Sequence, residues 1–140
     1  MSSDEYPEGE HAWAAFVATR IHIYVDKDTV TVQPDLVPER FPWNHPVYVI
    51  TGWNPGVVCS VETNNVANGE LEAVLRASGH PVYSAEGCAI DGSWAEESYA
   101  VEGLAREEAI AIGRRFGQLA IFEVTAAGVD VIGCTDTSVG

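Results

Sequence analysis

The chain has 140 residues, 46% of them hydrophobic, and its 21 acidic and 7 basic residues give a formal net charge of -14. This composition is too apolar for a disordered chain, and the length is typical of one domain. The charge repels phosphate backbones and anionic membranes, so we expect neither nucleic acid nor membrane as a partner. It favours solubility and basic protein partners.

Cysteine and histidine usage gives no sign of a metal site. The three cysteines are far apart without a CxxC motif, and this odd count suits a reducing compartment. No histidine spacing resembles a zinc site, so we expect no metal and no other cofactor, although a metal held by residues distant in sequence stays open. The acidic start lacks the basic and apolar segments of a signal peptide, and no apolar run could span a membrane. We therefore expect a cytoplasmic protein.

The first third of the chain predicts a tail, a helix and a hairpin. Residues 1–9 are expected to form a disordered acidic tail. Apolar spacing of three and four predicts a helix over Glu10–Arg20. Alternation predicts two strands, Ile21–Asp26 and Thr29–Gln33. Four prolines then make the segment Pro34–Pro46 irregular.

The rest of the chain alternates strands with two helices. A continuous apolar run predicts a central strand over Val47–Thr51, followed by a turn. Ser60 is a favourable N-cap residue, and Gly79 is favourable just after the C-terminus of a helix, so a helix is predicted between them. The remaining elements are expected in this order: a strand, Pro81–Cys88; a type I′ turn at Asp91-Gly92; a strand, Ser93–Val101; a helix, about Ala105–Phe116; and two strands, Leu119–Val124 and Val129–Cys134.

Together these elements predict the fold class. Clustered hairpins with few helices indicate an α+β fold in a single domain over residues 10–134. We expect a largely antiparallel sheet, with about three helices packed mainly on one face. Residues 135–140 are expected to be frayed.

Two amides continue an apolar stripe of the predicted 60–78 helix. Spacings of three and four place Asn64 and Asn68 on one face with Leu71 and Leu75. A buried amide needs hydrogen-bond partners, because leaving them unmet is costly. Two interpretations stay open: the amides hold the turn after residue 52, or they line a site for a ligand or partner.

Other polar residues lie near the predicted hairpin and at a helix–strand corner. On a strand, Trp94 and Ser98 face one way and Glu97 faces the other. These residues either lie on a solvated edge of the sheet or form part of a binding site. Gln118 lies between a helix and a strand, where it anchors a loop or serves a site. No known catalytic motif is present, so no catalytic residue is assigned. The candidate binding residues are Trp53, Asn54, Asn64, Asn68, Trp94, Glu97, Ser98 and Gln118.

Ordered motifs carry a resemblance to a known family. They are Tyr48-Val49-Ile50-Thr51-Gly52-Trp53-Asn54-Pro55-Gly56, Ser60-x3-Asn64-x3-Asn68-x2-Leu71, Gly87-x3-Asp91-Gly92-Ser93-Trp94-x2-Glu97-Ser98, Gly103-Leu104 and Gly113-Arg114-Arg115-Phe116-Gly117-Gln118-x-Ala120-Ile121-Phe122-Glu123. Over roughly Val47–Glu123 the chain resembles the bacterial domain of unknown function 3293 family, whose members usually show an alanine at the position of Gly52. The resemblance implies a small bacterial cytosolic protein and supplies no activity or catalytic residues.

The sequence favours a small acidic protein that acts as a non-enzymatic binding or regulatory module on a protein partner. One alternative is a small enzyme or ligand-binding domain with a polar pocket around Asn64, Glu97 and Gln118. Another is an inhibitor of a basic protein that mimics nucleic acid with its carboxylates. The first alternative predicts that these polar side chains line one open cleft, whereas buried and bonded side chains indicate scaffold.

Overall fold

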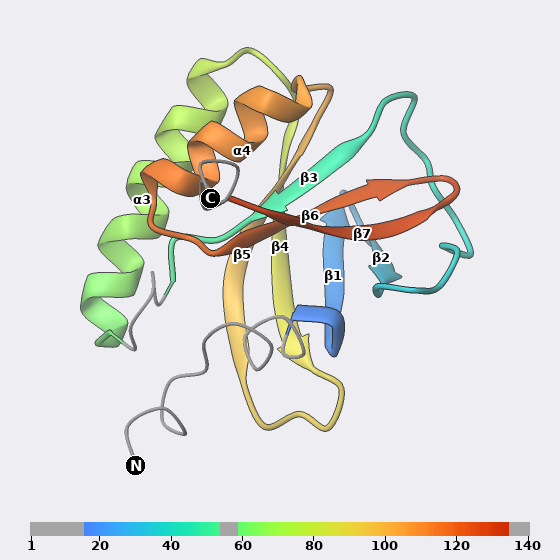
Figure 1. Ribbon diagram of the computed structural model, residues 1–140, viewed down its shortest axis with the longest axis horizontal. Helices are drawn as coiled ribbons and strands as arrows, with labels where there is room; N and C mark the ends of the chain where they lie inside the picture. Colours follow the sequence, from blue (N-terminus) through green and yellow to red (C-terminus); the bar gives the residue numbers. More distant parts are fainter. Residues whose placement is uncertain (1–15, 54–58, 135–140) are drawn as a thin grey trace, which may run out of the picture.

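Seven strands form one sheet in the computed structural model, which describes residues 16–53 and 59–134. All neighbouring strands are antiparallel, in the order β2-β1-β4-β5-β3-β6-β7. The strands are β1 (Thr19–Val25), β2 (Asp28–Val32), β3 (Val47–Ile50), β4 (Val82–Ala89), β5 (Ala95–Glu102), β6 (Ala120–Thr125) and β7 (Gly128–Gly133). Helices α3 (Val61–Ala77) and α4 (Arg106–Arg115) follow β3 and β5 in the chain (Figure 1).

The sheet is curled rather than flat. One buried cluster contains Val30 and Val32 of β2 together with Val129 of β7, although these strands are the two ends of the sheet. Their side chains share a cluster only because the sheet bends toward that face, and Figure 1 shows β6 and β7 crossing β1 and β4 at a steep angle. The right-handed twist of successive strands accumulates into this shape. The result is half of a barrel with an apolar inside.

Both helices pack against the outside of the curl. Leu71 and Leu75 of α3 share a buried cluster with Ala109 and Ile112 of α4 and with residues of β3, β5, β6 and β7. Because both faces of β3 are covered, all four of its residues are buried. This double burial explains the continuous apolar run of that strand. Neither helix is long and apolar enough to cross a membrane.

The predicted fold class is wrong. An α+β domain with about three helices was expected, whereas the described residues form a mostly β structure: a curled seven-stranded antiparallel sheet with two helices. The helix predicted to reach Arg20 accounts for part of the error, because Thr19 and Arg20 already belong to β1. Burial of Thr19, Ile21 and Ile23 on one side follows the period of a strand, and sheet pairing overrides the helical spacing upstream.

Several local predictions lie outside the described residues. They are the acidic tail at 1–9, most of the helix expected over 10–20, the turn at 54–56 and the frayed end at 135–140.

The helix ends confirm the capping signals of the sequence. The Ser60 hydroxyl accepts a hydrogen bond from the Thr63 amide and begins α3. Gly79, with φ of +82°, follows the end of α3, and Gly117, with φ of +74°, follows α4. An L-residue rarely adopts this conformation, which is why glycine is favoured there. The type I′ turn predicted at Asp91-Gly92 is wrong, since Gly92 has a positive φ and Asp91 does not.

Candidate functional site

Asn68 of α3 joins two segments of main chain beyond the end of β3. Its Oδ1 accepts a hydrogen bond from the Gly52 amide at 2.7 Å, and its Nδ2 donates to the Glu97 carbonyl at 2.9 Å. The residue is only 2% exposed, so these main-chain groups are shielded from water. A Cβ at position 52 would lie 3.0 Å from the Ala67 carbonyl carbon, so the glycine permits this approach. The amide therefore satisfies groups that the sheet leaves unpaired.

Two further bonds hold the segment Thr51–Trp53. The Thr51 hydroxyl donates to the Glu97 carbonyl at 2.6 Å and accepts from the Trp53 amide at 3.0 Å. Gln118, between α4 and β6, donates from Nε2 to the Trp53 carbonyl at 3.1 Å. The indole Nε1 of Trp53 is buried and has no hydrogen-bond partner within the described residues. Helix α3, strand β5 and the α4–β6 corner therefore converge on this one segment.

The remaining predicted residues contribute no side chain to these bonds, and Glu97 takes part only through its main-chain carbonyl. Asn64 is buried and donates to the Cys59 carbonyl at 3.4 Å, at the start of its own helix. Ser98 is buried, on the inside of the curl, whereas Glu97 faces the opposite side and Trp94 lies near the β4–β5 turn. Asn54 falls outside the described residues. A groove of about 370 Å³ lies between α3 and α4, and none of the predicted residues lines it. Its lining consists of Val74, Ala77, Ser78, Glu108, Ala111, Ile112 and Arg115.

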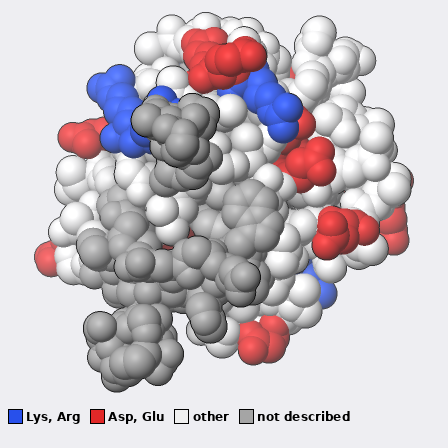
Figure 2. Space-filling model, in the orientation of Figure 1, with Lys and Arg blue, Asp and Glu red and all other residues white. Residues whose placement is uncertain are grey.

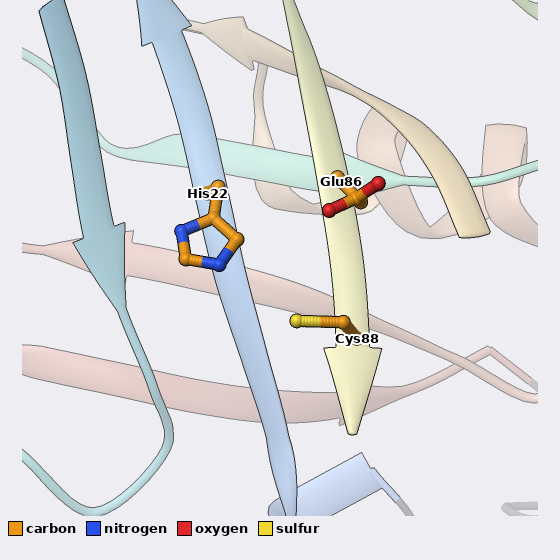
Figure 3. Close-up of side chains that lie close together, drawn as sticks. All are labelled: His22, Glu86 and Cys88. Carbon is orange, nitrogen blue, oxygen red and sulfur yellow. The ribbon is translucent and has the colours of Figure 1, made fainter. Parts of the chain in front are cut away.

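A cluster of metal-ligating side chains lies on the outer face of β1 and β4. The register places His22 directly opposite Glu86, and Cys88 lies two residues further along β4 on the same face. One ligand atom from each side chain lies within 4.8 Å of the other two, and all three residues are half-buried. Figure 3 shows the imidazole, the carboxylate and the thiol side by side on neighbouring strands.

The surroundings of this cluster are polar on three sides. His22 Nδ1 lies 2.8 Å from the Thr31 hydroxyl of β2. On the other side, Glu97 of β5 lies opposite Glu86. Burial raises the pKa of Tyr24, and the nearby Glu86 carboxylate and Cys88 thiol raise it further, because negative charges disfavour a phenolate.

Sequence reasoning missed this cluster. Alternation in β1 does place His22 on the polar side, and the spacing of Glu86 and Cys88 puts both on one face of β4. No local pattern, however, shows that β1 pairs with β4, because about half of the domain separates the two strands in the chain. Metal ligands that meet across two distant strands show no characteristic spacing in the sequence, so a motif search does not find them.

The tip of the β4–β5 hairpin exposes apolar side chains beside a carboxylate. Ile90 is 47% exposed and Trp94 is 38% exposed. Between them, Asp91 accepts a hydrogen bond from the Ser93 amide at 2.9 Å, and bonds from Ser93 lower the pKa of its carboxyl. The hairpin extends past the rest of the sheet, away from both helices (Figure 1).

None of the curated proteins and none of the solved structures matches the chain. A family model matches residues 50–121, just over half of the chain, from the end of β3 into β6. This span holds the network around Asn68, the hairpin tip and Gln118, whereas His22 lies outside it. By this match, the chain belongs to the family of proteins of unknown function DUF3293.

Proposed function

We propose that the protein is a non-enzymatic binding module that docks a basic segment of a protein partner on the tip of the β4–β5 hairpin. The observation that carries the proposal is the exposure of Trp94 and Ile90 at one projecting turn. Tryptophan is enriched at the energetic centres of protein interfaces, because it contributes a large apolar surface at small entropic cost. A tip that extends from the sheet presents this surface to a partner without rearrangement.

Charge around the tip favours a basic partner. Asp91 lies within the turn and carries a negative charge at neutral pH, and bonds from Ser93 lower the pKa of its carboxyl further below the ordinary value of 3.8. Glu96 and Glu97 follow Trp94 on the returning strand. The whole chain carries a net charge of -14, which accelerates encounter with cationic segments and repels acidic ones. Apolar anchors rimmed by carboxylates fit a lysine- and arginine-rich segment with an apolar residue at its centre.

The geometry of the amides supports this proposal over a polar pocket. Asn68 and Gln118 donate to main-chain carbonyls of the protein itself, so these donors serve the scaffold. Glu97 contributes its main-chain carbonyl to this network, as the acceptor of hydrogen bonds from Asn68 and Thr51. A nucleic-acid mimic needs carboxylates in rows near the spacing of phosphates. Figure 2 instead shows Asp and Glu in separate patches on the face that it draws.

Photo-crosslinking tests the docking site. A benzophenone amino acid replaces Trp94 in the full chain, and in a second variant it replaces Val37, which is 67% exposed in the loop between β2 and β3. Both positions are exposed and apolar, so crosslinks from non-specific collisions should form at similar yields from the two variants. Irradiation of the native cells should give a discrete adduct from position 94 and none from position 37. Adducts of equal yield from both positions, or none from position 94, would contradict the proposal.

A further inference from the structure

We infer that His22, Glu86 and Cys88 form a site for one Zn²⁺ ion on the outer face of β1 and β4. This inference is independent of the docking function, because it concerns other residues and a different ligand. The three side chains offer an imidazole nitrogen, a carboxylate oxygen and a thiol sulfur within 4.8 Å of one another. Zn²⁺ binds all three donor types, and its filled d shell accepts the geometry that they impose.

The mixed donor set narrows the choice of metal. Hard cations such as Mg²⁺ and Ca²⁺ take oxygen ligands, and neither the imidazole of His22 nor the thiolate of Cys88 suits them. Borderline and soft ions accept nitrogen and sulfur together. Zn²⁺ is the ion of this class that binds such sets without redox chemistry.

Small side-chain rotations bring the three ligand atoms to bonding distance. Tetrahedral ligands around Zn²⁺ lie about 3.3–3.7 Å apart, which follows from metal–ligand bonds of about 2.0–2.3 Å. The three atoms lie within 4.8 Å of one another, so they must approach by at most about 1.5 Å. Glu86 and Cys88 reach this spacing by rotating about their side-chain bonds, with no change in the strand register.

His22 is already oriented for coordination through Nε2. Its Nδ1 lies 2.8 Å from the Thr31 hydroxyl, and Figure 3 shows the other ring nitrogen on the side of the Cys88 sulfur. With a metal on Nε2, Nδ1 carries the proton and donates a hydrogen bond to the Thr31 hydroxyl oxygen. Metal-binding histidines commonly donate their second N–H to an oxygen in this way, which fixes the ring and its tautomer.

Electrostatics favour a cation at this place. Glu86 and Glu97 lie directly opposite each other on β4 and β5, and like charges in such a pair destabilise a sheet. Neither carboxylate forms a salt bridge within residues 16–53 and 59–134, although the register places Arg20 opposite Cys88. A divalent cation bound to Glu86 would offset this repulsion. Three protein ligands leave a fourth position of the tetrahedron for water.

Metal titration of the full chain tests the inference. The reduced, metal-free protein is titrated with Co²⁺, whose bond to a thiolate gives a charge-transfer absorption band, and Zn²⁺ is then added to displace it. We expect one equivalent of Co²⁺, with a thiolate band that Cys88→Ser abolishes and Cys59→Ser leaves unchanged. Glu86→Gln should weaken Zn²⁺ binding at least about tenfold, since it removes a charged ligand without changing shape.

A matched pair on β2 keeps the test independent of misfolding. Thr31→Val removes the hydroxyl beside His22 Nδ1 and should lower Zn²⁺ affinity roughly 10–100-fold. Thr29→Val makes the same change two residues away on the exposed face of the same strand, and affinity should not change. The absence of a thiolate band in the wild-type protein, a band that persists in Cys88→Ser, or equal affinities for the two threonine variants would overturn the inference.

Discussion

The side-chain amide of Asn68 forms hydrogen bonds with two separate main-chain groups. Its amide satisfies the Gly52 N–H and the Glu97 carbonyl, both shielded from water. Asn68→Leu keeps the approximate volume, leaves the Gly52 N–H unpaired and removes one of the two hydrogen bonds to the Glu97 carbonyl, so the free energy of unfolding should fall by about 1–3 kcal/mol. For a chain of this size the melting temperature should fall by several degrees, as thermal denaturation will show.

A neighbouring asparagine provides the control. Asn65 lies on the same helix and is exposed, so Asn65→Leu makes the same chemical change without orphaning buried groups. Its melting temperature should stay within about one degree of the wild type, since surface substitutions change stability little. Equal melting temperatures for the two variants would show that Asn68 does not stabilise the turn.

Tyr48 makes stability depend on alkaline pH. Its hydroxyl donates to Glu123 Oε2 at 2.7 Å, and burial, reinforced by that carboxylate, raises the pKa of Tyr48 well above its ordinary value of 10.0. A phenol with a higher pKa in the folded state contributes its stability below the unfolded pKa and loses it as pH rises toward the folded pKa. Denaturant unfolding should therefore give a falling free energy between about pH 9 and pH 12.

The variant Tyr48→Phe isolates this contribution. It removes the ionisable hydroxyl and keeps the ring, so the loss of stability over the same pH range should become smaller. Tyr99 continues to contribute, because burial and Glu72 raise its pKa too. A pH slope identical to that of the wild type would assign the alkaline lability to other groups.

At the scale of single residues, the sequence predicted what lies on one element and missed what spans two. Asn68 was found because its spacing from Leu71 and Leu75 is a property of one helix. His22 and Glu86 meet through pairing between strands that are distant in the chain, and no residue near either one indicates the other.

Helix α4 is held close to the sheet at Gly113. A Cβ at this position would lie 2.7 Å from both Cys134 Sγ and Ile121 Cγ2, closer than side chains approach without a shift. Gly113→Ala should therefore destabilise the protein by about 1–3 kcal/mol through overpacking. This loss outweighs the gain of up to about 1 kcal/mol in helix propensity.

Gly69 in α3 offers the opposite case. It also lies within a helix, but nothing lies within 4 Å of a Cβ built there. Gly69→Ala should raise the free energy of unfolding by about 0.5–1 kcal/mol, because alanine restricts the unfolded chain and favours helix. Chemical denaturation of both variants measures the difference. Shifts of the same sign would contradict the packing of α4 against β6 and β7.

At the scale of elements, the strands were predictable where the apolar pattern matched their burial, on one face for β1 and β2 and on both faces for β3. Alternation identified β1 and β2, and the apolar run identified β3, to within about two residues. The helix expected up to Arg20 failed because two periods overlap there, and the pairing of Thr19 with Ala89 decides between them. The turn at Asp91-Gly92 failed because Ile90 and Ser93 also belong to the loop, as the Gly92 amide bond to the Ala89 carbonyl shows.

For the whole molecule, the order of the strands determines what is left on the surface. Helices α3 and α4 pack on the outer face, and the half of that face built from β1, β2 and β4 carries the His22 cluster. The hairpin β4–β5 extends from the same half. The curl of the sheet brings side chains of β2 and β7 into one buried cluster. No local pattern in the sequence predicts this contact between the two ends of the sheet. The mostly β fold was therefore missed although most strands were identified.

The central claim is that the hairpin tip docks a basic segment, and the composition of the peptide crosslinked from position 94 tests it most directly. Mass spectrometry of the adduct identifies that peptide. The proposal predicts a segment of another protein that is rich in lysine and arginine, with an adduct yield that falls as salt is raised during irradiation of a lysate. An acidic or neutral peptide, or a yield that salt does not change, would contradict it.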